Sequence, residues 1–209
     1  TNIRRSENGF PALLQNDALN AAAARKARDM FARQYFAHES PTGEGAAYLA
    51  EEEGYRAILI GENLALGNFE NDKALVDAWM ESPGHRANIL HERYREIGVA
   101  VLAGEFEGRS TWVGVQVFGL PRSACPGVDE MRLAQIQANE RELDNLQAAL
   151  QAKRAEVESM KPRRGDEYRR AAEEYNALAE QYNALLQTAN SMVEEYNAEV
   201  EAANTCMVG

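Results

Sequence analysis

The chain has 209 residues, which is enough for one or two domains. Its 22 Lys and Arg residues against 33 Asp and Glu residues give a formal net charge of −11, which argues against nucleic acid and anionic membrane surfaces as partners, since both require a basic patch. No apolar run approaches the ~20 residues that cross a bilayer, and the polar start TNIRRSENG has no apolar signal core, so we expect a soluble chain, or a mature one whose targeting segment is missing.

The first half of the chain predicts a mixed α and β structure. Residues 16–34 place apolar side chains at helical spacing, with Asn16 as the N-cap. A second, short helix is expected within residues 43–54, where Gly54 occupies the position that favours a C-terminal cap. A third helix is expected over residues 71–80. Helices thus come before the strand-like segments in this half.

The stretch SPGHRANIL after the third helix predicts a new helix start. Ser82 suits the N-cap, and Pro83 suits the first helical position, where its missing N–H has no cost. His85 then falls in the first turn, where the helix dipole disfavours the imidazolium and favours a neutral ring that accepts a proton or a metal ion. The alternative from the residues alone is a buried, hydrogen-bonded histidine.

Two β-rich runs follow, at residues 96–104 and 110–119, and the segment EFEGR joins them as an antiparallel hairpin. Both runs are apolar on both faces, as in VAV and WVGVQVF. Strands of this kind are covered on both sides, so we predict a core with helices above and below a sheet.

Composition changes near GLPRSACPGVDE, which predicts one domain over residues 1–122 and a second over residues 123–209. The second domain reads as two long helices, at about 128–161 and 166–204, separated by KPRRGD. Apolar residues and tyrosines recur there at intervals of seven residues or a multiple of seven, which predicts an antiparallel coiled-coil hairpin. These rows include Ile136, Leu143, Leu150 and Val157 in the first helix and Tyr168, Tyr175, Tyr182 and Tyr196 in the second.

Candidate site residues lie outside this repeat. His38 follows the first helix in AHESPTG, and Glu62 stands within the otherwise apolar run ILIGENLALG. Glu81 ends the helix of Trp79, shortly before His85. Two imidazoles with two carboxylates form a coherent set, because imidazoles bind a divalent metal ion while carboxylates orient them or accept protons from metal-bound water. No short metal motif links these residues, so the spacing alone leaves a structural role open.

The motifs AHESPTG, GENLALG, WMESPGHRANIL and YREIGVAV with WVGVQVFG, in this order, resemble a bacterial member of the CAP superfamily, also called SCP. This superfamily includes cysteine-rich secretory proteins, venom antigens and plant pathogenesis-related proteins, and the likeness covers residues 14–120. It implies an α+β fold: a secreted α-β-α sandwich with a small antiparallel sheet, here followed by the helical hairpin. The hairpin itself resembles nothing in the family.

The resemblance also implies a central cleft lined by two histidines and two acids. Matched by motif, these are His38, Glu62 and His85, while Glu81 is the least secure because many relatives carry the acid one residue later. We expect the rings of His38 and His85 within about 3–5 Å of each other if one metal ion bridges them, with Glu62 hydrogen-bonded to one imidazole. His91 matches no family motif and is expected on the surface.

We therefore expect a secreted binding module whose cleft takes a divalent metal ion such as Zn²⁺ or a small ligand, including a lipid. The alternative is a metal-dependent or His/Glu hydrolase that uses the same cleft. Against it stands the lack of a nucleophile, since Ser40 and Ser82 each precede a proline and suit turn or capping roles. A third reading makes the helical arm the functional part. We also expect Asn63 and Asn88 to be structural, because Asn in irregular segments satisfies unpaired backbone groups.

The arm raises two further expectations. A third apolar row, formed by Leu186, Val193 and Val200, makes the apolar stripe wider than a two-helix seam requires, so we expect a dimer through the arm, or packing on a protein partner. Cys125 and Cys206 are one disulfide or two free thiols; if the segment between them is one hairpin, its midpoint falls in KPRRGD and the two sulfurs meet. The secretion implied by the resemblance supplies the oxidising compartment for that disulfide.

Overall fold

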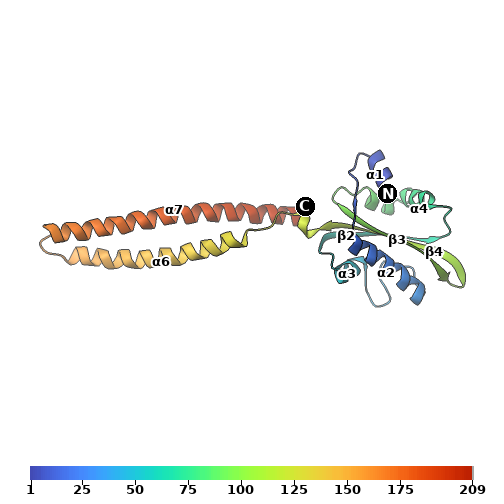
Figure 1. Cartoon of the computed structure of the whole chain (residues 1–209), viewed down its shortest axis with the longest axis horizontal. Helices are drawn as coiled ribbons and strands as arrows, with labels where there is room; N and C mark the ends of the chain where they lie inside the picture. Colours follow the sequence, from blue (N-terminus) through green and yellow to red (C-terminus); the bar gives the residue numbers. More distant parts are fainter. Residues whose placement is uncertain (209) are drawn as a thin grey trace. The chain divides into compact units, whose positions relative to one another are not determined.

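The computed structural model describes residues 1–208 and divides into two compact units, a head of residues 1–124 and an arm that begins at residue 125 (Figure 1). The elements of the head are α1 (Asn2–Glu7), β1 (Leu14–Gln15), α2 (Asp17–Arg33), α3 (Ala46–Glu52), β2 (Ala57–Gly67), α4 (Asp72–Glu81), α5 (Pro83–Ile89), β3 (Glu96–Phe106), β4 (Arg109–Pro121) and a 3-10 turn (Arg122–Ala124). The arm contains α6 (Glu130–Ser159) and α7 (Asp166–Val208).

The head contains one four-stranded sheet in the order β1-β3-β4-β2. The predicted hairpin is present: β3 and β4 are antiparallel, and Glu107 and Gly108 between them both have positive φ angles, of 49° and 73°. Such a pair of angles matches the right-handed twist of the flanking strands. β2 is antiparallel to β4, while the short β1 pairs parallel with β3 and makes the sheet mixed.

Helices cover both faces of the sheet, as the two-sided apolar pattern of its strands predicts. On one face, Val113, Val115 and Val117 of β4 join a buried cluster with α2 and α3. On the other face, Phe118 joins a second buried cluster with residues of α4 and α5. Figure 1 shows the sheet between α2 and α3 on one side and α4 on the other. Because alternate residues of β4 face opposite layers, the buried part of the strand is apolar except for Gln116.

The helix boundaries follow the local signals in the sequence. Asn16 caps α2, and its side chain accepts hydrogen bonds from the amides of Ala18 and Leu19. Pro83 is the first residue of α5, and Ser82 is its N-cap residue but makes no side-chain capping bond. Ser82 also ends α4, so its extended backbone separates two helices that follow each other directly.

Four elements add to the sequence prediction: the N-terminal helix α1, the strands β1 and β2, and the 3-10 turn. α1 is anchored by the buried Arg5, whose guanidinium donates hydrogen bonds to the backbone oxygens of Pro11, Ile89 and His91 at 2.8–2.9 Å. β2 contains the ILIGENLALG run, so Glu62 is a strand residue beside β4.

The arm is a helical hairpin closed by the predicted disulfide between Cys125 and Cys206. α6 spans 30 residues and α7 spans 43, so the observed first helix is slightly shorter and the second slightly longer than expected. Side-chain pairs such as Arg132 with Glu199 near the disulfide, and Lys153 with Glu174 near the turn, require the two helices to be antiparallel. Coiled-coil packing of the heptads stays a prediction. Among the described residues, no helix combines the length and the apolar character that crossing a membrane requires.

Candidate functional site

His38 and Glu62 form a close polar pair in the head. His38 lies in the loop between α2 and α3, and Glu62 lies in the middle of β2. The Nδ1 atom of His38 is 2.6 Å from Oε1 of Glu62, so the predicted contact between Glu62 and an imidazole is present. The His38 side chain is 67% exposed, whereas that of Glu62 is 5% exposed. The pair thus joins a solvent-facing imidazole to a buried carboxyl group.

This contact determines which ring nitrogen of His38 is available. When Glu62 is ionised its carboxylate only accepts, so the Nδ1–H of His38 donates to it. The lone pair of the neutral ring is then on Nε2, where it can accept a proton or bind a metal ion.

One carboxyl oxygen of Glu62 has no hydrogen-bond partner among the described residues. Burial raises the pKa of Glu62, while the hydrogen bond from His38 and the positive charge of Lys26 act in the opposite direction. Its second oxygen, Oε2, is buried and has no hydrogen-bond partner among the described residues. A buried carboxyl oxygen without a partner is unfavourable, so this atom marks a place where a donor or a cation would be stabilised.

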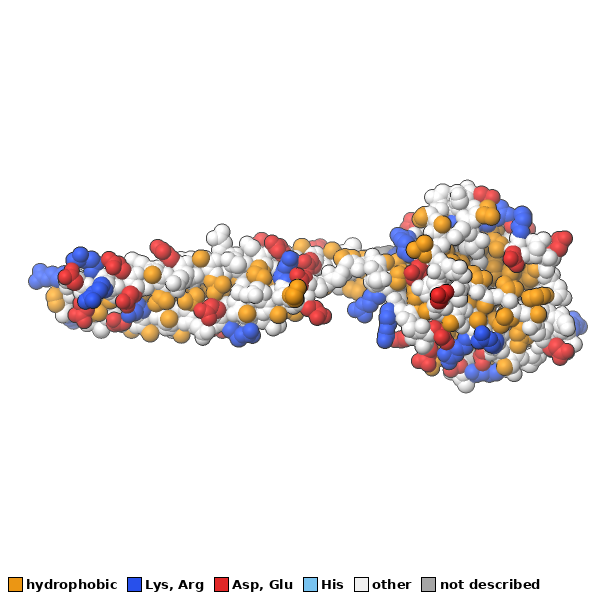
Figure 2. All heavy atoms as spheres, viewed as in Figure 1, with side chains coloured by type: hydrophobic (Ala, Val, Ile, Leu, Met, Phe, Trp, Pro, Cys, Tyr) orange, Lys and Arg blue, Asp and Glu red, His pale blue; other side chains and the backbone are white. Residues whose placement is uncertain are grey.

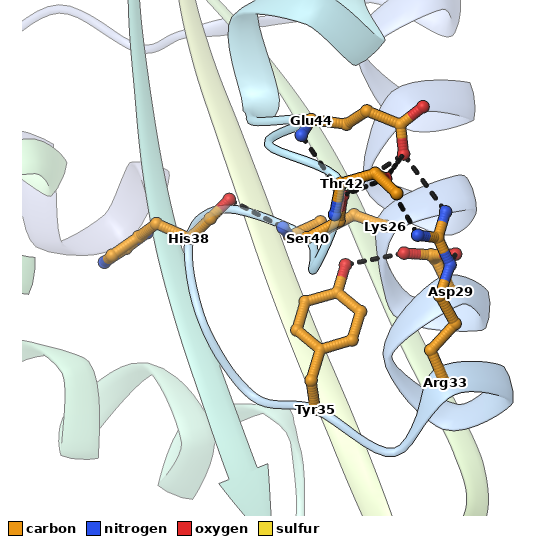
Figure 3. A network of polar contacts seen from close by, with 8 residues as sticks. All are labelled: Lys26, Asp29, Arg33, Tyr35, His38, Ser40, Thr42 and Glu44. Atoms are coloured by element: carbon orange, nitrogen blue, oxygen red, sulfur yellow. Dashed lines mark hydrogen bonds and ion pairs between the residues drawn. The ribbon is translucent and has the colours of Figure 1, made fainter.

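The buried Lys26 of α2 fixes the loop that carries His38. Its side chain is 1% exposed, and Nζ donates a 2.6 Å hydrogen bond to the backbone oxygen of His38 (Figure 3). The ammonium group also lies 5.1 Å from the ring centroid of Tyr35. Sequence analysis missed this residue. Its signal was its place on the apolar stripe of α2 between Ala23 and Met30, where a lysine needs buried partners.

Two more residues on the same face of α2 hold the remainder of this loop. Asp29 accepts a hydrogen bond of 2.7 Å from the hydroxyl of Tyr35. Arg33 donates to Thr42 at 2.8 Å and to the carboxylate of Glu44 at 3.1 Å. Figure 3 shows these side chains reaching from the helix to successive points of the loop, while the His38 ring points away from them. The position of His38 is therefore set by α2.

His85 belongs to the first turn of α5, as predicted. Burial lowers the pKa of His85, and the nearby His38 lowers it further, since two imidazolium charges repel. The ring is therefore neutral over a wider pH range than an exposed histidine, which keeps a nitrogen lone pair available.

A buried amide network joins β2 to α5 next to this pair. Asn63, which is fully buried, donates through Nδ2 to the backbone oxygen of His85 and to Oε1 of Gln116, both at 3.1 Å. Asn88 donates through its own Nδ2 to Oδ1 of Asn63 and to the backbone oxygen of Glu62, both at 3.0 Å. These contacts support the structural role predicted for Asn63 and Asn88, and they hold the backbones that carry Glu62 and His85.

The other candidates lie apart from this network. Glu81 is the exposed last residue of α4, and within residues 1–208 no hydrogen bond or ion pair joins it to His38, Glu62 or His85. His91 is partly exposed, which agrees with the expected surface position, and its ring packs against Tyr94, with 4.6 Å between centroids, and accepts a hydrogen bond from the amide of Arg93. Across the described chain, no group of three or more His, Cys, Asp and Glu side chains is placed to hold a metal ion.

A separate cavity of about 480 Å³ lies on the α4 side of the sheet. Its lining includes Thr1, Leu13, Leu75, Trp79, Val99 and Gln116, and none of the four candidate site residues.

Comparison with known proteins covers the head. The protein YkwD of Bacillus subtilis is 36% identical over 112 residues, which is 54% of this chain and 42% of that protein. The membrane protein YlbC of the same species is 31% identical over 101 residues, or 48% of this chain and 29% of that protein. This chain thus spans less than half the length of these curated relatives.

Two solved structures are also similar to the head. An extracellular protein of Bacillus anthracis that contains an SCP domain matches with a TM-score of 0.49 and 29% identity, over 56% of this chain and 37% of that one. An outer surface protein of Borrelia burgdorferi matches with a TM-score of 0.49 and 20% identity, over 57% of this chain and 86% of that one.

The family model of the cysteine-rich secretory proteins matches residues 1–118, which is more than half of the chain and includes His38, Glu62 and His85. The chain therefore belongs to the cysteine-rich secretory protein (CAP) family.

Proposed function

We propose that this chain is a secreted binding module that takes a divalent metal ion, or a small polar ligand, at the site of His38, Glu62 and His85. The supporting observation is the buried Oε2 atom of Glu62, which has no partner among the described residues, next to an imidazole that Glu62 itself orients. A donor group of a bound polar ligand would satisfy this oxygen, whereas a metal ion would bind the outward nitrogen of the imidazole that Glu62 orients. Secretion is supported by membership of the cysteine-rich secretory protein family.

The residues fit a divalent metal ion in part. His38 would bind it through Nε2 and His85 through one nitrogen of its neutral ring, with Glu62 orienting His38 from behind. Two imidazoles leave further coordination positions open to water or a ligand, so we expect an exchangeable ion rather than a structural one. Such an ion would supply positive charge to hold an anionic or carbonyl group.

Binding is favoured over hydrolysis by the surroundings of Ser40, one of the two serines that follow or precede the histidines in the sequence. Ser40 lies two residues after His38, but its Oγ donates to Glu44 at 3.2 Å and accepts from the amides of Thr42 and Glu44. The hydroxyl of Ser40 is therefore hydrogen-bonded within the loop, and it makes no hydrogen bond to an imidazole that would activate it. Hydrolysis at this site stays the alternative.

Isothermal titration with Zn²⁺ tests the proposal. The native chain should bind about one equivalent, and a His38→Ala/His85→Ala variant should lose binding at least about tenfold. His91→Gln is the matched control, because it removes the third histidine of the chain and should leave Zn²⁺ affinity unchanged. Equal affinity in the double variant and the native chain would contradict the proposal, and ester or peptide turnover lost only in the double variant would favour the hydrolase.

The second part of the proposal concerns the arm, which we propose joins a second copy of the chain. The Leu, Val and Met residues of its heptad rows are only half-buried within one hairpin, whereas Ile136 is buried. A second hairpin would bury the rest of their apolar surface. Sedimentation at increasing chain concentration measures this association directly.

A further inference from the structure

The charge of the arm is distributed unevenly along its length. The tip, which we define as residues 153–170 around the turn, has seven basic and four acidic side chains, a net charge of +3. The base, defined as residues 129–145 of α6 and 190–208 of α7, has two basic and nine acidic side chains, a net charge of −7. In Figure 2, Lys and Arg side chains gather at the tip. The arm therefore has a positive end and a negative end.

Pairing within the chain does not remove this difference. At the base, Arg132 pairs with both Glu195 and Glu199, so one cation serves two carboxylates. At the tip, Lys161 and Arg164 are exposed and make no side-chain hydrogen bond or ion pair among the described residues. Both ends therefore present unbalanced charge to solvent.

The apolar seam is also incompletely covered between these ends. The buried residues within the described part of the arm are Ile136, Asn139, Ala171, Ala189 and Ala203, and only Ile136 is a large apolar residue. Leu186, Val193 and Val200, which form the third apolar row, are half-buried. A hairpin of this kind has apolar surface left for another pair of helices.

We propose that two arms pack side by side in antiparallel orientation, with the tip of each against the base of the other, as a four-helix bundle. The proposed orientation depends on one part of the proposed function, the association of two arms. It places a charge of +3 beside a charge of −7 at both ends of the bundle, whereas a parallel pair would place like charges together at both ends. The charges therefore select the orientation, while the apolar rows supply the contact area.

The orientation can be tested on the native chain with a carbodiimide, which joins a lysine to a carboxylate that touches it. Equal amounts of ¹⁴N- and ¹⁵N-labelled chain are mixed, so that mass spectrometry identifies links between two different copies. We expect links from Lys161 to acidic residues of the base, such as Glu194 and Glu201, and few links from Lys161 to acidic residues of the tip. Links between copies that join only tip to tip would overturn the antiparallel orientation while leaving the association intact.

A charge-reversal variant provides the energetic test. Reversing Lys161, Arg163 and Arg164 to Glu changes the tip from +3 to −3, which turns attraction toward the base into repulsion. The dimer dissociation constant should rise at least about tenfold at about 50 mM salt and less at about 500 mM salt, because salt screens exposed charges. The matched control reverses three exposed arginines of the head, Arg28, Arg109 and Arg122, for the same change in net charge.

Equal dissociation constants for the tip variant and the control would overturn the proposal. A native chain that stays monomeric at about 1 mM would contradict arm pairing altogether and leave the arm to a partner of another kind. Neither result bears on the Zn²⁺ titration, which reports only on the head.

Discussion

Replacement of Asn63 by Ala tests whether the amide network beside His85 is structural. Asn63 is fully buried and takes part in three side-chain hydrogen bonds, two as donor and one as acceptor. Each such bond contributes about 1 kcal/mol net, and the partners left in the interior add a desolvation penalty. We therefore expect the free energy of unfolding to fall by about 3–4 kcal/mol.

Asn88→Ala should have a smaller effect. This side chain is half-buried and donates to two acceptors, the backbone oxygen of Glu62 and Oδ1 of Asn63. A loss of about 2 kcal/mol is expected. The ranking of the two variants follows from their numbers of hydrogen bonds and from their burial.

Thermal unfolding followed by circular dichroism measures these losses. A domain of this size loses about 3–5 °C of melting temperature per kcal/mol, so Asn63→Ala should lower the melting temperature by about 10–15 °C. The control is Asn68→Ala, which changes an exposed asparagine just after the same strand and should shift it by less than about 2 °C. A large loss of Zn²⁺ affinity in Asn63→Ala with an unchanged melting temperature would refute the structural role.

Three further predictions concern other parts of the chain. Gly98→Ala should destabilise the head by at least about 3 kcal/mol in denaturant unfolding, because a Cβ there would lie 2.0 Å from the backbone of α2. The control, Gly84→Ala, has no neighbour within 4 Å of the added Cβ and should be neutral or stabilising. Replacing Cys125 and Cys206 by Ser opens a loop with a sequence separation of 81 and should destabilise the arm by up to about 4–5 kcal/mol. The helical circular-dichroism signal should then be lost at a lower temperature, as it should in the native chain under reducing conditions. Burial raises the pKa of Glu62 in the folded state, so its contribution to stability is present below the unfolded pKa of about 4.3 and declines as pH rises through the higher folded pKa. Glu62→Gln should therefore gain melting temperature relative to the native chain as the pH rises above about 4.3, and a difference that does not vary with pH would contradict this origin.

Much of the head follows from local sequence signals. The cap at Asn16 and the break at Pro83 determine where helices start, and the β3–β4 hairpin follows from its two-sided apolar runs and the turn at Gly108. The disulfide follows from the heptads of the arm, because a hairpin that turns at KPRRGD brings Cys125 and Cys206 together. The helix starts and the β3–β4 hairpin follow from residues close in sequence, and the disulfide follows from a repeat that continues along the whole arm.

Residues that act across the sequence were harder to predict. β2 was not identified as a strand, because Glu62 and Asn63 interrupt its apolar run, and their hydrogen-bond partners are side-chain and backbone groups 22 to 53 residues away. Arg5 was also missed, since arginines are rarely buried and its acceptors are backbone oxygens, two of them more than 80 residues distant. Local sequence patterns do not indicate hydrogen-bond partners that are so distant in the sequence.

Lys26 and Glu62 show why these missed residues matter for the site. Burial lowers the pKa of Lys26 and raises the pKa of Glu62, so burial disfavours the charged form of each group. Each charge also opposes this effect at the other, because the attraction between an ammonium and a carboxylate is strong where water is excluded. Removing either one would leave the other as an uncompensated buried charge. The hydrogen bond from Lys26 to the backbone of His38 then links this charge balance to the position of the exposed imidazole, so the site includes a lysine that contacts no solvent.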